Sequence, residues 1–345
     1  MDRVNVAVIG LGMGRAHLHN YLQSPQANVV AICDANTERL NTVGDQNGIQ
    51  KRFTEIEELF NMPGLEAVSV ALPNFLHAPV TIAALKAGLH VMCEKPLAMN
   101  AQEGEAMVAA AKAAGKQLMV HFNTRYQEPS RFARKIVDEG LVGPIYFGRT
   151  GWHRNRGIPG GIGGWFTSKE RAGGGPLIDL GVHRLDLALW LMDYPKPVAV
   201  TGSTYSELGK ELCQREGREF DVEDLAAGFI RFENGASLIL ESSWATNTGR
   251  ANEGFTTLMG LKGGLYLHNE GEGYEFRGHA YHEVGGQLVE VQQKQPLPPA
   301  TPQGDFVKAL LAGKPVPASG DQGLQVMRIL DALYLSAAEG REIRL

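Results

Sequence analysis

The chain has 345 residues, more than one hydrophobic core usually accommodates, so two domains are expected. Hydrophobic residues make up 43% of the chain, charged residues 21%, and the formal net charge is -5. This balance excludes the basic excess that nucleic acid or an anionic membrane surface requires. Since no apolar run has the length of a membrane span and the first residues lack a secretory signal pattern, we expect a cytoplasmic protein.

The cysteines and histidines show no pattern of a metal centre. The chain has three cysteines, Cys33, Cys93 and Cys213, and no Cys-x-x-Cys motif. An odd number without that motif argues against a disulfide framework and against a structural zinc site. The ten histidines also lack cysteines or carboxylates at a recognisable ligand spacing. We therefore predict reduced, buried thiols and no metal ion.

The first third of the chain has the pattern of a parallel sheet wrapped by helices. Short β-branched runs are expected to be strands at Val4–Ile9, Val29–Cys33, Ala67–Leu72, His90–Cys93 and Gln117–His121. Helix-forming stretches separate them, at Arg15–Gln23, Thr37–Asp45, His77–Ala87 and Ala101–Ala114. The pattern predicts an N-terminal doubly wound α/β domain of the Rossmann type, over residues 1–122.

The sequence pattern changes after a predicted helix at Gln127–Glu139. Strands of mixed polarity are expected at Ile145–Arg154, Ala227–Phe232, Ser237–Trp244 and Thr256–Leu261, and Asn234-Gly235 predicts a hairpin turn. Helices are expected at Leu177–Leu191, Asp305–Leu311 and Leu324–Ala338. Residues 123–345 are therefore predicted to form a mostly antiparallel α+β domain.

The turn after the first strand predicts a dinucleotide site. Gly10, Gly12 and Gly14, with Met13 between them, stand where a strand must turn into a helix whose N-terminal amides receive a pyrophosphate. A strict fingerprint has its third glycine at position 15, where this chain has Arg15. The alternative to a dinucleotide site is a tight turn that binds no ligand.

Asp34 ends the second strand, where a carboxylate can accept hydrogen bonds from both ribose hydroxyls. It would repel a 2′-phosphate, so NAD is favoured over NADP. Arg39 is the one nearby cation that could turn toward such a phosphate, although a solvated helix face is the simpler interpretation of it.

Four segments together identify a family. They are ALPNFLH at 71–77, CEKP at 93–96, VHFNTRY at 120–126 and GGGPLIDLGVHRLD at 173–186. With the glycine turn, they resemble the glucose-fructose oxidoreductase / inositol dehydrogenase (Gfo/Idh/MocA) family over nearly the whole chain. The resemblance implies a two-domain subunit whose second domain carries a large open, mostly antiparallel sheet, with substrate held between that sheet and the nicotinamide.

The same segments supply candidates for alcohol oxidation. Asp179 and His183 are four residues apart at a predicted helix start, so both side chains project to one side. Histidine is the side chain whose ordinary pKa lies nearest neutral pH, which makes His183 the predicted base. The resemblance implies that Lys95 hydrogen-bonds the reacting hydroxyl and orients the nicotinamide, and that Asp179 positions substrate or stabilises the charged base. Lys95 is the alternative base, and a helix cap is the plain alternative for Asp179.

Further cofactor contacts are expected where parallel strands end. We predict them at Pro73, Asn74, His77, Glu94 and Lys95. For Asn74 and His77 a turn followed by a helix cap is an equal alternative.

The segment Gly151–Phe166 is expected to border the substrate. Aromatic rings suit the C–H face of a sugar and arginines suit an anionic substituent, but a surface loop with an aromatic plug is the plain alternative. The candidate substrate residues are Asn123, Arg125, Trp152, Arg154, Arg156 and Trp165.

The predicted activity is hydride transfer between NAD and a secondary hydroxyl of a sugar, sugar derivative or cyclitol. Glycoside cleavage through transient ring oxidation is one alternative, and a non-catalytic dinucleotide sensor is another. An open sheet face in the second domain also predicts a homo-oligomer, dimer or tetramer.

Overall fold

The computed structural model describes residues 3–159 and 162–345, and the chain divides into two compact units. Unit 1 comprises Met1–Phe122 and Ala300–Met327, and unit 2 comprises Asn123–Pro299 and Arg328–Leu345. Cys33, Cys93 and Cys213 are free and buried.

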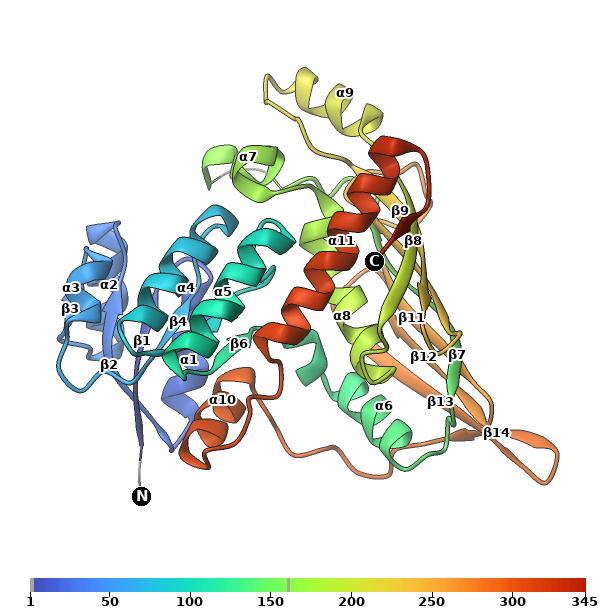
Figure 1. The fold of residues 1–345 in the computed structure, drawn as a ribbon, viewed down its shortest axis with the longest axis horizontal. Coiled ribbons are helices and arrows are strands. Elements are labelled where there is room, and N and C mark those ends of the chain that lie inside the picture. Colours follow the sequence, from blue (N-terminus) through green and yellow to red (C-terminus); the bar gives the residue numbers. More distant parts are fainter. Residues whose placement is uncertain (1–2, 160–161) are drawn as a thin grey trace. The chain divides into compact units, whose positions relative to one another are not determined.

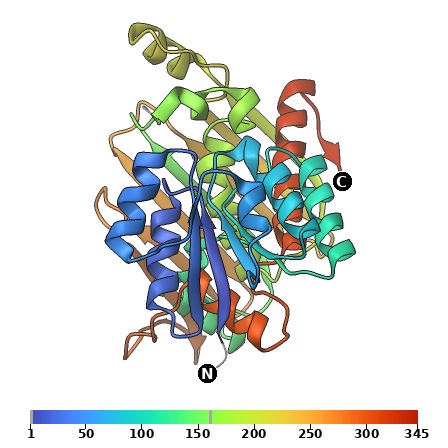
Figure 2. The ribbon, with the colours of Figure 1, turned by 90° about the vertical axis from the view of Figure 1, so that its left-hand side faces the viewer.

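Unit 1 is built on six parallel strands in the order β3-β2-β1-β4-β5-β6, which confirms the predicted parallel sheet and adds the short strand β3 to the five predicted strands. The strands are β1 (Val4–Ile9), β2 (Ala27–Cys33), β3 (Arg52–Phe53), β4 (Ala67–Val70), β5 (His90–Cys93) and β6 (Leu118–Val120). Helices flank the sheet on both sides (Figure 2), which explains why β1 and β5 consist almost wholly of buried apolar residues. The chain order reverses between β1 and β4, the place where sheets of this kind bind ligands.

The helices of unit 1 begin and end at residues suited to those positions. They are α1 (Gly14–Gln23), α2 (Thr37–Asn47), α3 (Ile56–Phe60), α4 (His77–Lys86), α5 (Ala101–Ala114) and α10 (Pro302–Leu311). Asn100 caps α5 by accepting a hydrogen bond from the Glu103 amide, and Gly115 ends it in the left-handed conformation. Asn36 caps α2 in the same way.

Residues 300–327 depart from the predicted boundary, because the sequence analysis placed everything after residue 122 in the second domain. Gln303 donates a hydrogen bond to His121, and Ser319 pairs with Met119 beside β6. Lys112 of α5 contacts Asp321 at 2.8 Å. This segment returns to unit 1 because it completes polar and apolar contacts that the first 122 residues leave open, which no local pattern reveals.

Unit 2 contains a nine-stranded sheet in the order β14-β13-β12-β11-β7-β10-β9-β8-β15. Its strands, labelled in Figure 1 except for β10 and β15, are β7 (Ile145–Arg154), β8 (Pro197–Tyr205), β9 (Leu225–Phe232), β10 (Ser237–Ser243), β11 (Asn252–Gly260), β12 (Gly263–Asn269), β13 (Phe276–Val284), β14 (Gln287–Val291) and β15 (Ile343–Arg344). All neighbouring pairs are antiparallel except β7 with β10, which confirms the predicted mostly antiparallel sheet. The hairpin turn predicted at Asn234-Gly235 joins β9 to β10.

Helices pack against one face of this second sheet. α6 (Glu128–Asp138) contacts β12 and β13, and α8 (Val182–Leu191) contacts β7 and β11. Unit 2 also contains α7 (Lys169–Ala172) and α9 (Glu207–Arg215), while α11 (Gly320–Glu339) begins in unit 1 and ends in unit 2. Tyr266 and Arg149 are exposed on the sheet, and Arg149 pairs with Glu241.

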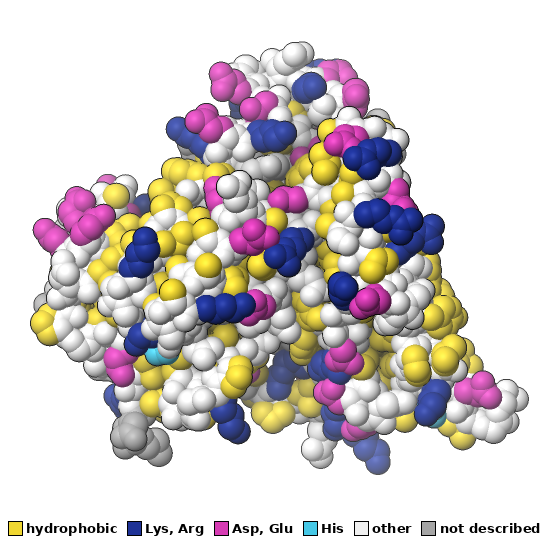
Figure 3. Space-filling view, in the orientation of Figure 1, with side chains coloured by type: hydrophobic (Ala, Val, Ile, Leu, Met, Phe, Trp, Pro, Cys, Tyr) yellow, Lys and Arg dark blue, Asp and Glu magenta, His cyan; other side chains and the backbone are white. Residues whose placement is uncertain are grey.

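No helix within the described residues is long and apolar enough to cross a membrane. On the face drawn in Figure 3, acidic and basic side chains are interspersed. This surface matches the mixed charge that the composition indicates.

Candidate functional site

The first turn of unit 1 consists of glycines that meet different steric demands. Gly10 has a φ of +84°, and a Cβ there would lie 2.4 Å from the carbonyl oxygen of Ala71. A Cβ at Gly12 would meet no described atom within 4 Å, so this backbone faces open space. A bare backbone at a helix start lets phosphate oxygens approach the amides.

The packing of Gly14 explains why the turn does not need a glycine at the position of Arg15. A Cβ at Gly14 would lie 2.9 Å from Cγ1 of Val8 and 3.3 Å from Cβ of Ala71. Gly14 therefore provides the close helix-to-strand packing that the strict fingerprint assigns to its third glycine. Arg15 is exposed and its Nε lies 3.5 Å from the Gly12 carbonyl oxygen, while Met13 is exposed beside it.

Asp34 connects this turn to the start of α2. Its carboxylate accepts the amides of Leu11 at 2.7 Å and Asn36 at 2.8 Å, and Arg39 donates to both oxygens at 2.8 Å. Burial opposes ionisation of Asp34, but the hydrogen bonds from Arg39, Leu11 and Asn36 outweigh it and lower its pKa. Arg39, for which the sequence left open a solvated face or a turn toward a 2′-phosphate, pairs with Asp34 while 41% of its side chain stays exposed.

A hollow of about 320 Å³ opens beside this ion pair. Both arginines of the region contribute to it, and its lining residues are Arg15, Asn36, Glu38, Arg39, Thr42, Val43 and Gln46. Its place, beside the carboxyl end of β2, is where a dinucleotide-binding sheet receives the adenosine ribose.

His77 joins the two turns that follow β4 and β5. Its Nδ1 lies 2.7 Å from the Pro96 carbonyl oxygen and its Nε2 lies 2.8 Å from the Leu72 carbonyl oxygen. The His77 side chain is fully buried, and Asn74 is buried at the start of a short 3-10 turn, Asn74–Leu76. A cofactor role for His77 would therefore act through the turns that carry Pro73 and Lys95.

Glu94 lies in a buried cluster that the sequence analysis did not predict. His17 Nε2 lies 2.8 Å and His121 Nδ1 lies 2.9 Å from the same oxygen, Oε1, of Glu94. The other oxygen, Oε2, accepts the backbone amide of Lys95 at 2.9 Å. Burial alone would raise the pKa of Glu94, but His121 and His17 hold it well below the ordinary value.

This Glu94 cluster also has the composition of a metal-binding group. Among the described residues, the ligand atoms of His17, Glu94 and His121 lie within 4.8 Å of one another. Two imidazoles and a carboxylate are a donor set that transition metals accept. The absence of a metal stays a prediction.

In unit 2, a π-helical turn (Leu177–Gly181) leads directly into α8. Asp179 lies in this turn and accepts a 3.0 Å hydrogen bond from Trp244 Nε1. His183 follows in the first turn of α8, with its Nδ1 3.2 Å from the hydroxyl of Thr124. Single π-helical turns are often found at functional sites.

Trp152 and Trp244 connect these two residues to one core. Both rings pack in a buried cluster with Leu180 and Val222, and the Trp152 ring centroid lies 6.2 Å from that of His183. Trp152 is only 7% exposed and donates its Nε1 proton to Asn252. Trp152 thus corresponds to the aromatic-plug alternative of the sequence analysis, with little area left for a ligand.

The other predicted substrate residues in unit 2 already have protein partners. Arg125 is buried and forms hydrogen bonds to both carboxylate oxygens of Asp186, at 2.9 and 2.6 Å, and Asn123 contacts Thr124. The remaining contacts are Arg154 with the Tyr274 hydroxyl, Arg156 with the Thr246 carbonyl and the Asn247 side chain, and Trp165 stacked on Phe166 at 3.8 Å. Residues 160–161 of the predicted loop lie outside the described residues.

Arg184, which follows His183, is a buried cation that the sequence analysis did not single out. Its guanidinium lies 4.6 Å from the Trp152 ring and 4.2 Å from the Phe276 ring, and none of its three nitrogens has a hydrogen-bond partner among the described residues. Burial lowers the pKa of Arg184 to about 9. Its charge is balanced by aromatic faces rather than by a carboxylate.

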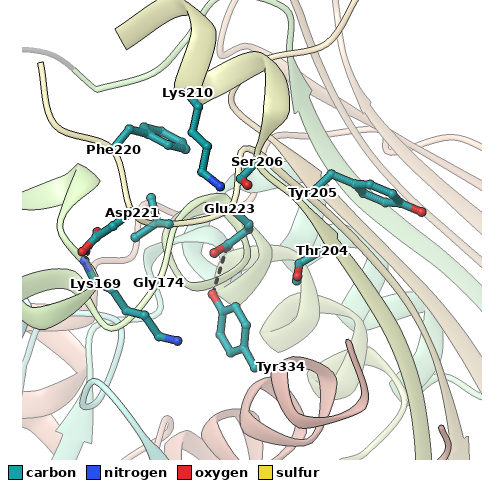
Figure 4. A pocket seen from close by; sticks show the side chains of 11 residues that line it. Lys169, Gly174, Thr204, Tyr205, Ser206, Lys210, Phe220, Asp221, Glu223 and Tyr334 are labelled. Atoms are coloured by element: carbon teal, nitrogen blue, oxygen red, sulfur yellow. Dashed lines mark hydrogen bonds between the residues drawn. The ribbon is translucent and has the colours of Figure 1, made fainter. Parts of the chain in front are cut away.

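Unit 2 also contains a cavity of about 380 Å³ (Figure 4). Glu223 and Tyr334 line it, and the Tyr334 hydroxyl donates to Glu223 Oε1 at 2.9 Å. Glu223 also accepts the amides of Gly175 and Leu177, each at 2.9 Å, and burial raises its pKa. Glu223 thus secures the chain that leads into the π-helical turn, and none of the predicted site residues lines this cavity.

Comparison with known proteins decides the family. Residues 4–122 match the model described as "Oxidoreductase family, NAD-binding Rossmann fold", and residues 130–266 match the "GFO/IDH/MocA C-terminal domain". The chain is 31% identical to D-glucoside 3-dehydrogenase of Escherichia coli (strain K12), covering 99% of this chain and 97% of the relative. It belongs to the Gfo/Idh/MocA family.

Two further Gfo/Idh/MocA proteins resemble it over nearly their whole length. Levoglucosan dehydrogenase of Pseudarthrobacter phenanthrenivorans is 30% identical, over 98% of this chain and 97% of the relative. The solved structure of a levoglucosan dehydrogenase with NADH and levoglucosan superposes with a TM-score of 0.85, at 27% identity and 99% coverage of each chain.

The first unit of this Gfo/Idh/MocA chain therefore carries the family's NAD-binding Rossmann domain. The open backbone at Gly12, the close packing at Gly14 and the carboxylate of Asp34 fit a pyrophosphate and a ribose. The chain is accordingly an oxidoreductase of this family that binds NAD.

Proposed function

We propose that this protein transfers a hydride between NAD and a secondary hydroxyl of a neutral sugar, sugar derivative or cyclitol. The observation that carries the proposal is the junction of the π-helical turn and α8. There Trp244 donates a hydrogen bond to the Asp179 carboxylate, and Thr124 contacts the imidazole of His183, four residues further along the chain. Both Trp244 and the Trp152 ring near His183 belong to one buried hydrophobic cluster. A base with an oriented imidazole and a nearby carboxylate is what removal of a hydroxyl proton requires.

NAD, when bound, supplies the acceptor for the hydride. His183 takes the hydroxyl proton, and the contact between its Nδ1 and the Thr124 hydroxyl orients the imidazole for this role. Asp179 stabilises the resulting imidazolium or orients the substrate, and Lys95 donates a hydrogen bond to the developing alkoxide. Pro73, Asn74 and Glu94 shape the turns on the cofactor side.

The engaged arginines favour a neutral substrate. Arg125 is neutralised by Asp186, and Arg156 donates to protein oxygens, so neither offers an unpaired guanidinium to a carboxylate or phosphate. Neutral carbohydrates are also the substrates named for two relatives, a glucoside dehydrogenase and a levoglucosan dehydrogenase.

A substrate screen tests this proposal. NADH formation is measured at 340 nm with methyl glucoside, levoglucosan, myo-inositol, gluconate and glucose 6-phosphate. We expect turnover of at least one neutral compound, and loss of kcat by about 10²–10⁴-fold in both His183→Asn and Lys95→Ala. Glycoside cleavage without net NADH would instead support the redox-assisted reaction. NAD binding with no reaction on any compound would support a sensor and overturn the proposal.

The cofactor preference has its own test. Because Arg39 is paired with Asp34, we expect NAD to give much the higher kcat/KM, and Asp34→Ala to release Arg39 and move the preference toward NADP. Glu38→Ala, which alters the same hollow without breaking the pair, is the matched control. A wild-type enzyme that prefers NADP would contradict this assignment.

We also propose a homo-oligomer that covers the exposed sheet face of unit 2. Light scattering of the purified protein, compared with Tyr266→Glu, tests it. A monomeric wild type would contradict it.

A further inference from the structure

We propose that the Glu94 cluster of His17, Glu94 and His121 is a positioning network that fixes the backbone of Lys95. The inference rests on the proposed catalytic role of Lys95. It adds His17, which lies outside the four family segments, and assigns a positioning role to Glu94 and His121 within them. These three residues come from α1, the end of β5 and the end of β6, so the network can be formed only after the sheet has assembled.

The carboxylate of Glu94 is held on both sides. Oε1 faces the two imidazoles, with His17 Nε2 at 2.8 Å and His121 Nδ1 at 2.9 Å, and Oε2 accepts the Lys95 amide at 2.9 Å. The His17 hydrogen bond is well formed, whereas the His121 N–H is out of line with the oxygen. Rotating the carboxylate would break the contact with Lys95 and the contact with His17 together.

A second layer of partners fixes the two rings. His17 Nδ1 contacts the Ser69 hydroxyl at 3.1 Å, which in turn contacts the hydroxyl of Tyr21 at 3.2 Å. His121 Nε2 accepts a hydrogen bond from the Gln303 side-chain amide at 3.1 Å, so its proton belongs on Nδ1, facing Glu94. Gln303 lies on α10, which gives the return of residues 300–327 to unit 1 a role in the site.

Lys95 is thereby held at two successive points. Its own amide is fixed by Glu94 Oε2, and the carbonyl of the next residue, Pro96, contacts His77 Nδ1 at 2.7 Å. Both anchors are buried: Glu94 is 8% exposed and His77 is fully enclosed. A side chain that starts from a backbone fixed on both sides reaches its target at a lower entropic cost, and a displacement of about 1 Å can cost about 100-fold in rate.

The charges in this cluster keep the network in one state. Burial lowers the pKa of His17, and the neighbouring His121 lowers it further against the opposing effect of Glu94. Glu94 is therefore ionised at neutral pH and accepts the hydrogen bond from His17 Nε2, while His121 Nδ1 lies 2.9 Å from the same oxygen. Such hydrogen bonds to a buried charge are stronger than those between neutral groups.

The test uses matched pairs of variants. His17→Gln keeps an N–H group near the position of Nε2, whereas His17→Leu removes it. Glu94→Gln keeps one oxygen for the Lys95 amide, whereas Glu94→Ala keeps none. We expect kcat to fall by about 10–100-fold in Glu94→Ala and about 10-fold in His17→Leu, with the KM for NAD changed less than about threefold, and to recover at least partly in the two conservative variants.

The same changes in a Lys95→Ala background separate positioning from general damage. A network that acts through Lys95 has nothing left to position there, so Glu94→Ala and His17→Leu should lower the residual rate by less than about twofold. His90→Leu, at the opposite end of β5, is the control for loss of a histidine in the same sheet, and it should leave kcat unchanged. Circular dichroism and thermal melting identify any variant that fails to fold.

The outcomes are distinct. The positioning network would be overturned if Glu94→Ala and His17→Leu lowered kcat as much in the Lys95→Ala background as in the wild type. It would also be overturned if His17→Gln and His17→Leu lowered kcat equally. Normal kcat in Lys95→Ala itself would instead overturn the proposed function. Metal analysis of the purified enzyme should show no stoichiometric ion, and an ion that disappears in Glu94→Ala would make the cluster a metal site and contradict the proposal.

Discussion

In both units a buried glutamate holds the backbone of a turn to which we assign a catalytic residue, and the two glutamates differ in their surroundings. Glu94 in unit 1 accepts the Lys95 amide and faces two imidazoles, which hold its pKa well below the ordinary value. Glu223 in unit 2 accepts the amides of Gly175 and Leu177 and the Tyr334 hydroxyl, and burial raises its pKa. The same task, holding backbone amides, is thus performed by a carboxylate that is kept ionised and by one that resists ionisation.

The difference shows that neighbours decide how a buried carboxylate responds to pH. A lowered pKa in the folded state contributes stability above the unfolded value, and that contribution is lost as pH falls through the folded pKa. A raised pKa has the opposite sign, since its contribution is complete below the unfolded value and is lost as pH rises through the folded pKa. Three changes test this comparison.

The largest effect is expected for Glu94→Gln. The amide has one acceptor oxygen for donors on two sides, so a buried N–H group loses its partner, and we expect a loss of about 3 kcal/mol in the free energy of unfolding at pH 7. The deficit in unfolding free energy relative to wild type should narrow as pH falls below 4.5, the ordinary pKa of a glutamate, toward the lowered pKa of Glu94. Urea unfolding at several pH values measures it. A deficit that grows toward acid pH would break the comparison.

Glu223→Gln should have a smaller effect with the opposite pH trend. The glutamine side chain has one acceptor oxygen, so one of the two backbone hydrogen bonds is lost. In weakly acidic solution we therefore expect a loss of about 1 kcal/mol in the free energy of unfolding. As pH rises from 4.5 through the raised pKa of Glu223, the wild type loses stability and the variant does not. The difference between their free energies of unfolding should therefore shrink. The same urea series measures it, with Tyr334→Phe as a control that removes only the hydroxyl. A difference that increases with pH would count against the assigned environment.

The smallest effect is expected for Lys112→Ala. Its ammonium lies 2.8 Å from Asp321, but the two side chains are 68% and 62% exposed. Exposed pairs are screened by water and salt, so we expect a change below about 0.5 kcal/mol with little pH dependence. A loss as large as that of Glu94→Gln would show that residues 300–327 depend on this pair rather than on their buried contacts.

The sequence predicted what local patterns encode. The glycine turn, the hairpin at Asn234-Gly235 and both sheet types follow from periodicity and turn chemistry over a few residues. The roles of Gly14 and Arg39 could not be predicted, because they depend on contacts with other parts of the chain. Ala71 and Val8 crowd Gly14, and Asp34 binds Arg39. A residue's contacts across the fold decided both.

The Glu94 cluster and the Arg125–Asp186 pair were beyond sequence reasoning for the same reason. His17 and Glu94 are 77 positions apart, and Arg125 and Asp186 are 61 positions apart. Side chains so distant meet only when strands and helices assemble. The sequence marks them as polar residues near strand ends or helices, a signal too common to select them.

The most direct test of the central claim, hydride transfer to NAD, follows the hydrogen itself. The enzyme is incubated with NAD and with methyl glucoside, levoglucosan or myo-inositol deuterated on carbon, and the nicotinamide is examined by NMR. We predict deuterium at C4 of the reduced nicotinamide with at least one compound, and none with His183→Asn under the same conditions. Protein that binds NAD but yields no deuterated NADH from any of these compounds would contradict the account.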